Sequence, residues 1–218
     1  MIVPIFPLPD VVFFPKTYLP LHIFEDRYRA MTRKALAGNG SIAMVLLRDG
    51  WELDCRGNPA VHPVACLGKI DSYEELKGGK YNIVLAGLHR VRLVREIQHS
   101  PYRLAHVEKL KDEHYDHGAT DIIRRRNRLG ALFMRYVELV AERAPLRRDF
   151  AAQHSFEALV NLVAMTLSLP PEDKQLLLEI DDIAERCDCV IPALQEQVET
   201  LVLVRRFEHL KPGDPARN

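Results

Sequence analysis

Proline spacing at the start of the chain limits its fold more than any other sequence feature. Residues 4–24 have the sequence PIFPLPDVVFFPKTYLPLHIF, with prolines at positions 4, 7, 9, 15 and 20. Proline lacks a backbone N–H and its ring clashes with the preceding helical turn, so no helix can run through this segment. Strand ends and sheet edges tolerate proline. The segment therefore predicts two short buried strands joined by a tight, proline-stiffened loop.

A helical segment follows, and after it come four extended runs. Phe24, Tyr28, Met31 and Ala35 recur at the spacing of one helix face. Six strands and one helix within the first ~110 residues suit a small closed or partly closed barrel. The four extended runs comprise residues 41–47, 61–76, 80–98 and 102–110.

Glycines indicate how the two longest runs are joined and shaped. The turn Lys-Gly-Gly-Lys at 77–80 lies between them and predicts a β-hairpin. Gly87 lies inside the second of these runs, and a glycine in mid-strand predicts a bulge or a sharp bend. The first half of the chain is therefore expected to be rich in antiparallel sheet.

The second half of the chain has a helical pattern throughout. A polar stretch at 111–121 ends in a plausible helix cap, Thr120 or Asp121. We predict two domains, a β-rich domain of residues 1–112 and a helical domain of residues 118–211. The apolar positions of three helices are Ile122, Leu129, Phe133, Tyr136 and Val140; Phe156, Leu159, Val163 and Leu167; and Ile183, Cys187, Ile191, Leu194, Val198 and Leu201, while Pro171 opens a further helix between the last two.

The composition is that of a globular protein without an obvious charged partner. The chain has 218 residues, 47% of them hydrophobic, and 30 basic side chains balance 30 acidic ones. Nucleic-acid-binding modules usually carry a basic excess, so the balance argues against nucleic acid as a partner. No segment has the roughly 18 consecutive apolar residues of a membrane span. Four cysteines without a C-x-x-C pair, and a start unlike a signal peptide, predict a cytoplasmic protein.

Motifs for catalysis or metal binding are weak. The sequence contains no Walker phosphate loop, no G-x-S-x-G and no H-E-x-x-H. His114 and His117 in the segment DEHYDH could share a metal ion if that segment were helical. A solvated linker between the two domains is the simpler interpretation of these histidines. We therefore predict no metal site and no cofactor.

Three further features have two interpretations each. The basic run RRRNR at 124–128 could contact phosphate, but a solvated helix face explains it without a partner. Cys187 could bind a soft metal, but it falls on the inward stripe of its helix, as a buried inert thiol would. Trp51 lies in a glycine-containing loop, where it is either an exposed binding residue or folded back onto the barrel.

Three motifs in the first half resemble the N-terminal domain of the Lon ATP-dependent protease family. The family start P-L-x-D-V-V-x-x-P is present at 7–15, P-L-x-I-F at 20–24, and G-x-x-R at 87–90. The resemblance covers about residues 2–110, and the helical remainder matches in type and rhythm. It implies an α+β fold, with an N-terminal PUA-like β pseudo-barrel containing one helix, followed by a C-terminal α-helical bundle.

The resemblance also implies a function. This sequence has no Walker loop and no counterpart of the Ser-Lys peptidase, so it is expected to be a non-catalytic, stand-alone Lon-like module that binds unfolded or client polypeptide segments. One alternative is an RNA-binding PUA-like protein, which would use residues 124–126. Another is a small metal-dependent enzyme that uses His114 and His117. The candidate binding residues are Phe14, Tyr18, Phe24, Trp51 and Tyr73.

Overall fold

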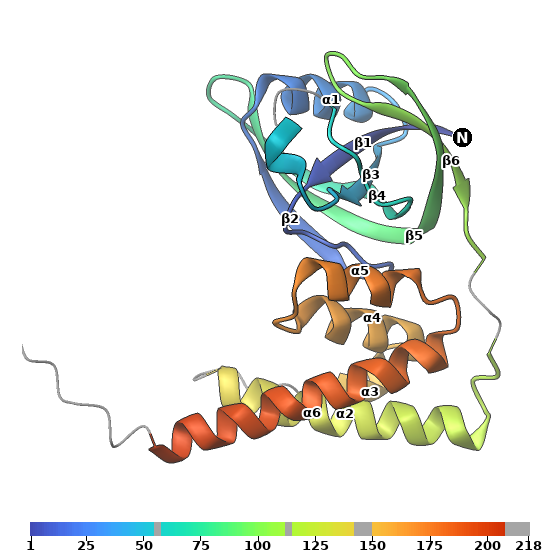
Figure 1. Cartoon of the computed structure of the whole chain (residues 1–218), viewed down its shortest axis with the longest axis vertical. Helices are drawn as coiled ribbons and strands as arrows, with labels where there is room; N and C mark the ends of the chain where they lie inside the picture. Colours follow the sequence, from blue (N-terminus) through green and yellow to red (C-terminus); the bar gives the residue numbers. More distant parts are fainter. Residues whose placement is uncertain (55–57, 112–114, 142–149, 208–218) are drawn as a thin grey trace, which may run out of the picture.

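The computed structural model of the protein describes residues 1–54, 58–111, 115–141 and 150–207. Figure 1 shows a strand-rich barrel stacked on a layer of helices. The barrel elements are β1 (Ile2–Leu8), β2 (Tyr18–Ile23), α1 (Asp26–Leu36), β3 (Ser41–Leu46), the short 3-10 helix η1 (Trp51–Asp54), β4 (Val64–Leu76), β5 (Lys80–Gln98) and β6 (Leu104–Lys109). The helices are α2 (Thr120–Val140), α3 (Phe150–Gln153), α4 (Phe156–Thr166), α5 (Pro171–Glu179) and α6 (Ile183–Phe207).

The six strands form one curled sheet in the order β2-β5-β4-β3-β1-β6, and a further β5–β6 pairing closes most of it into a barrel. The closure depends on the length of β5, which has 19 residues. Its first half pairs with β2 and its second half with β6. The predicted strand number, the hairpin at 77–80 and the partly closed barrel are therefore confirmed.

The boundary between β2 and α1 differs from the sequence prediction. Tyr28, Met31 and Ala35 are buried on one face of α1, as their spacing predicts. Phe24 was expected on the same stripe, but α1 begins at Asp26 and Phe24 still follows the alternation of β2. Its side chain is 57% exposed, because the residue next to it in the chain, Ile23, takes the inward position.

The predicted irregularity at Gly87 is confirmed, and its cause is a close backbone approach. The β4–β5 register shifts between Leu67 and Gly68, opposite this part of β5. A Cβ atom at Gly87 would lie 2.3 Å from the carbonyl oxygen of Phe14. The backbone N–H of Lys16 also donates to the Gly87 carbonyl at 2.8 Å. Glycine is therefore required for the β1–β2 loop to lie against β5.

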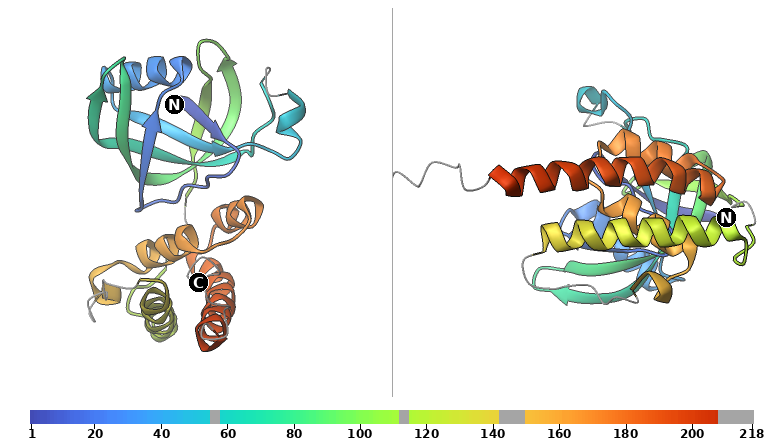
Figure 2. Two further views of the ribbon diagram at one scale, coloured as in Figure 1. Left: turned by 90° about the vertical axis from the view of Figure 1, so that its left-hand side faces the viewer. Right: turned by 90° about the horizontal axis from the view of Figure 1, so that it is seen from below.

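In the helical part, α2 and α6 lie side by side and run in the same direction (Figure 2). Helices α4 and α5 lie between this pair and the barrel (Figure 1). Ser155 caps α4 by accepting the N–H of Ala158, and Pro171 opens α5 as predicted. The predicted cap of α2 is wrong, because Ala119 occupies the N-cap position without a side-chain hydrogen bond. Val140, expected inside, is 53% exposed at the end of α2.

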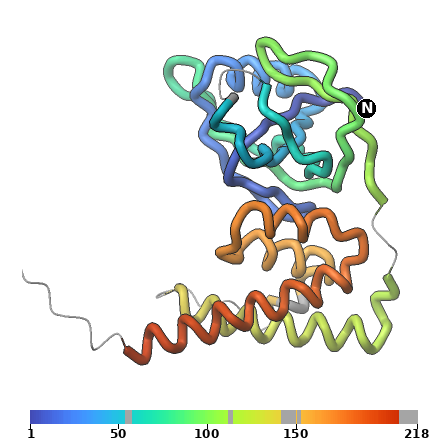
Figure 3. The backbone as a smooth tube through the Cα atoms, viewed as in Figure 1, coloured from blue at the N-terminus to red at the C-terminus, as the bar shows by residue number. Residues whose placement is uncertain are grey.

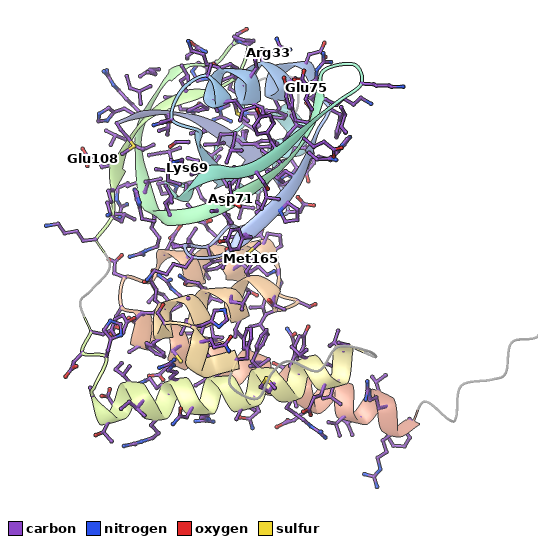
Figure 4. All side chains as sticks on the ribbon, turned by 180° about the vertical axis from the view of Figure 1, so that it is seen from behind. Arg33, Lys69, Asp71, Glu75, Glu108 and Met165 are labelled. Atoms are coloured by element: carbon purple, nitrogen blue, oxygen red, sulfur yellow. The ribbon has the colours of Figure 1, made fainter. Side chains whose placement is uncertain are left out.

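The barrel contributes side chains to the apolar core of the helices, in addition to the cores of its own. The β1–β2 loop lies directly against the helical layer (Figure 3). Val12, Phe14 and Val64 from the barrel belong to the same buried cluster as the inward faces of α2, α4 and α6. Met165 on α4 packs against both this cluster and the barrel's own cluster, and Figure 4 shows it at the junction. Phe14 was predicted to be displayed for binding, but it is fully buried because the loop inserts it between the two parts.

Buried hydrogen bonds accompany this apolar contact. Arg90 on β5 is fully buried and donates to the carbonyl oxygens of Leu178 at 3.1 Å and Ile180 at 3.0 Å. It also donates to the carboxylate of Asp181 at 2.8 Å. In the loop, the Pro15 carbonyl accepts the amide N–H of a buried asparagine on α4 at 3.1 Å. Buried polar groups need such partners, so the junction fixes the barrel in one position on the helices.

Candidate functional site

The open edge of the sheet is the strongest candidate site, and it is formed by β2. This strand pairs with β5 and with no other strand of the described residues. Pro20 lies in its middle opposite Val84, and the pairing continues on both sides. Proline cannot donate a hydrogen bond to a neighbour, so it is compatible with a strand whose alternate N–H groups face solvent.

The backbone phase of β2 follows from the hydrogen bonds at its start. The carbonyl of Thr17 accepts the N–H of Gly87 at 2.9 Å, so Thr17 directs its backbone groups to β5. In an antiparallel pair, residues alternate between directing these groups to one neighbour and to the other side. Tyr18, Pro20 and His22 therefore direct their backbone groups to the open edge of β2.

The same alternation directs every second side chain from residue 18 to residue 24 outward. We call this set the β2 strip; it consists of Tyr18, Pro20, His22 and Phe24. Tyr18 is 63% exposed and Phe24 57% exposed. The rings of His22 and Phe24 stack with their centroids 6.0 Å apart. The strip is thus an exposed, mostly apolar surface along the open edge.

A shallow hollow of about 440 Å³ lies beside the β2 strip and spans β2, β5 and β4. Three of the residues that line it are linked by polar contacts. His22 Nδ1 lies 2.7 Å from Asn82 Oδ1, and the Asn82 amide donates to Glu74 at 3.2 Å. Pro20 and Val84 provide the apolar part of the lining. The hollow therefore offers an apolar contact next to polar groups that are held in position.

Tyr73 also lines this hollow, but its side chain belongs to the other face of the sheet. It pairs with Ile83, whose side chain is buried inside the barrel. Directly opposed residues of an antiparallel pair share a face, so Tyr73 lies on the inner side where the barrel opens. It is 58% exposed there. The structure therefore groups Tyr18 with Phe24, and separates Tyr73 from both.

A second cleft, of about 490 Å³, begins where β2 ends. Glu25, Arg27 and Tyr28 line it on one side, and Trp51 on η1 lines it on another. Trp51 is half-buried. Part of its side chain packs onto the barrel, and part remains open to this cleft. Pro9 is a further apolar part of the lining. The cleft therefore offers both apolar and polar surfaces to a bound segment.

The charged groups of this cleft are already paired within the protein. The Arg27 guanidinium lies 4.5 Å from the centre of the Tyr28 ring and donates to Glu25 at 2.9 Å. Arg103 is buried and forms an ion pair with Glu96. Burial raises the pKa of the Tyr28 phenol, which keeps the phenol neutral at ordinary pH. The cleft therefore has hydrogen-bonding groups without a strong net charge to attract a free ion.

The basic run on α2 is engaged in contacts between helices. Arg125 donates to both carboxylate oxygens of Asp188 on α6, at 2.9 and 2.8 Å, and to Asp121 at 2.7 Å. These contacts raise the pKa of Arg125, and its hydrogen bonds hold the pKa of Asp188 below its usual value. Arg126 donates to the His154 carbonyl at 2.7 Å. The run therefore contributes to helix packing, and Arg124 is an exposed member of it.

The described residues give little support to the alternative of a metal-dependent enzyme. His114 lies outside the described residues, and His117 is exposed with its ring 4.5 Å from that of Tyr115. Within the part of the chain that the structure describes, no three His, Cys, Asp or Glu side chains are grouped as metal ligands would be. Burial raises the pKa of the Cys187 thiol to about 12, so this buried cysteine remains protonated and unreactive.

Sequence reasoning found two members of the β2 strip, Tyr18 and Phe24, and missed Pro20 and His22. The signal was present in the alternation of residues 18–24, where every second residue faces outward.

None of the helices in the described residues combines the length and apolar character of a membrane span.

Comparison with known proteins identifies the fold. The family described as the ATP-dependent protease La (LON) substrate-binding domain matches residues 2–196. Lon protease 2 of Myxococcus xanthus is 26% identical over 99% of this chain, and Lon protease of Citrifermentans bemidjiense is 29% identical over 92%. The chain spans 26% and 25% of these two proteins.

Two solved structures have the same fold as this chain. The N-terminal domain of Lon protease from the Mycobacterium avium complex superposes with a TM-score of 0.70 at 16% identity, and covers 90% of this chain and 99% of its own. A Lon N-terminal domain protein from Xanthomonas campestris gives a TM-score of 0.63 at 18% identity, with 88% and 98% covered. The match over residues 2–196 shows that the chain belongs to the LON substrate-binding domain family.

Proposed function

We propose that this protein is a non-catalytic module that binds extended polypeptide segments by strand addition along β2. The observation that carries the proposal is the open edge of β2, which pairs with β5 alone among the described strands. An exposed strand edge presents unpaired N–H and C=O groups that an extended peptide can satisfy. Such binding requires little sequence specificity, because the hydrogen bonds involve the peptide backbone.

The backbone groups of β2 define where a bound segment would pair. Tyr18 and His22 each offer an outward N–H and C=O, while Pro20 between them offers a carbonyl alone. The incoming strand would therefore pair most strongly at the two ends of β2 and be held by one acceptor in the middle. The proline also limits how well another folded sheet edge can pair here, which protects β2 from aggregation.

Side chains would add affinity to this backbone pairing. Tyr18 and Phe24 are exposed at the two ends of the β2 strip, and large aromatic side chains contribute most to protein interfaces. A segment that continues beyond Phe24 would reach the cleft lined by Trp51 and Tyr28. Unfolded polypeptides expose apolar side chains in extended backbone, and they match both features.

Family membership supports a role linked to proteolysis. The family is described as a substrate-binding domain, and relatives such as the Myxococcus xanthus protein are Lon proteases. This chain matches about a quarter of such a protein. We propose that client polypeptides are its partners, and that chemistry on those clients is performed by another module or protein. Arg125 and Arg126 of the basic run are engaged in contacts within the helical part, which disfavours RNA as the partner.

The test measures, by fluorescence anisotropy, the binding of a labelled, permanently unfolded protein. Each measurement is made with and without nuclease treatment of the samples. Replacing His22 by Pro removes one outward N–H of β2, and replacing it by Ala removes the side chain and leaves the N–H. We expect His22→Pro to weaken binding several-fold more than His22→Ala. Equal effects of the two substitutions would exclude strand addition, and binding that disappears with nuclease would favour RNA.

The contribution of the strip is tested separately. We expect the double substitution Tyr18→Asp and Phe24→Asp to weaken binding at least tenfold, because both side chains are exposed and the charge would oppose apolar clients. Leu176→Asp is the control, since Leu176 is 63% exposed on α5, and Tyr73→Asp tests the other face of the sheet. A larger loss with Tyr73→Asp would place the site on the inner face of the barrel.

A further inference from the structure

The last turns of α6 are apolar around most of their circumference. Val202, Leu203, Val204 and Phe207 are 39%, 54%, 51% and 54% exposed. We call residues 200–207 the α6 tip. Figure 2 shows that α6 continues past the described end of α2, so α2 does not shield the last turn of the tip. A helix segment that is apolar around most of its circumference is normally buried, which indicates that the tip has a partner.

A hollow that fits an apolar side chain lies next to the tip. It has a volume of about 530 Å³ and lies where α2, α6 and the segment between α4 and α5 meet. Tyr136 and Leu169 form apolar walls, and the side chain of Gln197 is fixed by two hydrogen bonds with the Ser168 backbone, at 3.1 and 3.3 Å. The hollow therefore has a preformed shape.

The hollow and the tip share one face of α6. Glu196 and Thr200 line the hollow and lie four residues apart on α6. Continuing along this face at spacings of three and four residues leads to Leu203 and then Phe207. A partner that packs along this face would contact the tip and the hollow together.

Charge along α6 selects the direction of a partner helix. Glu196 and Glu199 precede the apolar tip, and Arg205 and Arg206 lie within its last turn; all four are exposed. A second copy of the same helix in parallel orientation would place like charges together. In antiparallel orientation Glu199 of each copy lies near Arg206 of the other, which favours association, whereas Arg205 projects from the opposite side of α6.

We propose that two copies of this protein pair through antiparallel contact of their α6 tips, with Phe207 of each copy in the α2–α6 hollow of the other. If the twofold axis crosses α6 level with Val202, beside Leu203, then Phe207 lies five residues beyond it, about 7.5 Å along the helix. The residue five positions before the axis is Gln197, which lines the hollow. The tip and the hollow are therefore at matching distances from the axis, as a self-complementary interface requires.

This interface is independent of the β2 edge. Two short helical surfaces bury less area than a standard protein interface, so we expect a weak dimer with a micromolar dissociation constant. The β2 strip lies on the barrel and would remain open in each copy.

The first experiment is sedimentation equilibrium of the full chain from low micromolar to submillimolar concentration. We expect the average mass to rise from one chain towards two. Leu203→Glu is expected to abolish the rise, because it places a charge in the centre of the interface. Val94→Glu is the matched control, since Val94 is 51% exposed on β5 and lies outside the interface. A wild-type chain that stays monomeric throughout would overturn the proposal.

The second experiment tests the orientation. Glu199→Arg is expected to weaken association several-fold, because the new charge would face Arg206 of the other copy. Adding Arg206→Glu to that variant restores complementarity in antiparallel pairing and should return most of the lost affinity. A double variant that remains monomeric, or a dimer that Leu203→Glu leaves intact, would exclude this interface. Circular dichroism of each variant verifies that it is folded.

Discussion

At the scale of single residues, Gly87 and Arg90 show which structural roles the glycine and the arginine of the G-x-x-R motif have. Gly87 lets the carbonyl of Phe14 approach β5, and Arg90 extends from β5 to the end of α5. Both residues act at the junction of barrel and helices, three positions apart in one strand. The motif is therefore structural. Gly87 lets the β1–β2 loop lie against β5, and Arg90 holds the end of α5.

Replacing Arg90 by Met should lower the free energy of unfolding by on the order of 3 kcal/mol. The substitution keeps an apolar stem but removes the donor to the buried Leu178 carbonyl oxygen and to the Asp181 carboxylate. Urea denaturation measures the effect. Arg92→Met is the control, because Arg92 lies two residues further along β5 and is exposed. Equal effects at the two positions would refute a special role for Arg90.

Replacing Gly87 by Ala should destabilise the protein by about 1–3 kcal/mol or more, as overpacking does. The added Cβ would meet backbone atoms of the β1–β2 loop, which cannot move as a flexible side chain can. Thermal denaturation followed by circular dichroism would show a lowered midpoint. Gly38→Ala should be close to neutral, since its Cβ would make ordinary contacts of 3.5 Å. A neutral Gly87→Ala would contradict the close approach.

At the scale of elements, helices α2 and α6 are joined by the ion pair of Arg125 and Asp188. The pair holds the pKa of Asp188 below its unfolded value, so it contributes stability that is present above the ordinary aspartate pKa of about 3.9. This stability is lost as the pH falls through the lower pKa of the folded state. The exposed surface of the pair keeps the contribution small.

The measurable consequence is a difference between wild type and Asp188→Asn that depends on pH. At pH 7 the variant should be slightly less stable in urea denaturation, and the difference should shrink as the pH falls below about 4. Asp10→Asn, which changes an exposed carboxylate in the β1–β2 loop, should not reproduce this pattern. A constant difference across the whole pH range would show that the carboxylate charge is not involved.

At the scale of the whole molecule, barrel and helices share a core, although the chain divides into a β-rich and a helical half. The predicted domain limits, 1–112 and 118–211, follow this division and remain a prediction. Val12 and Phe14 from the barrel are buried by the helices. A barrel without the helices would expose these side chains, so the two parts are expected to unfold together.

Two probes can follow the two parts in one experiment. Trp51, the one tryptophan of the sequence, reports on the barrel by fluorescence, and far-ultraviolet circular dichroism reports mainly on the helices. We expect coincident urea transitions for the full chain. Phe14→Ala should shift both transitions together, by about 3–5 kcal/mol in the free energy of unfolding. Separate transitions, or a shift in one probe alone, would mean that the parts are independent domains.

Local patterns were sufficient for most of the architecture. The prolines excluded a helix at the start, the Lys-Gly-Gly-Lys turn indicated the β4–β5 hairpin, and helical spacing located the inward faces of α2, α4 and α6. These inferences succeed because backbone geometry and the period of apolar residues act over a few neighbouring positions. The family resemblance rested on three motifs in the first half of the chain, and it supplied the expected fold class.

Exposure of individual apolar residues depended on contacts between distant segments. Phe13 and Phe14 are adjacent and equally apolar, yet one belongs to the barrel core and the other to the helical core because the loop lies between the two. Arg90 finds its partners about 90 residues away. Periodicity shows which side of an element is apolar, whereas tertiary packing decides which of these residues is covered. This is why Phe14 was assigned wrongly to the surface and why the open edge of β2 became visible in the folded chain.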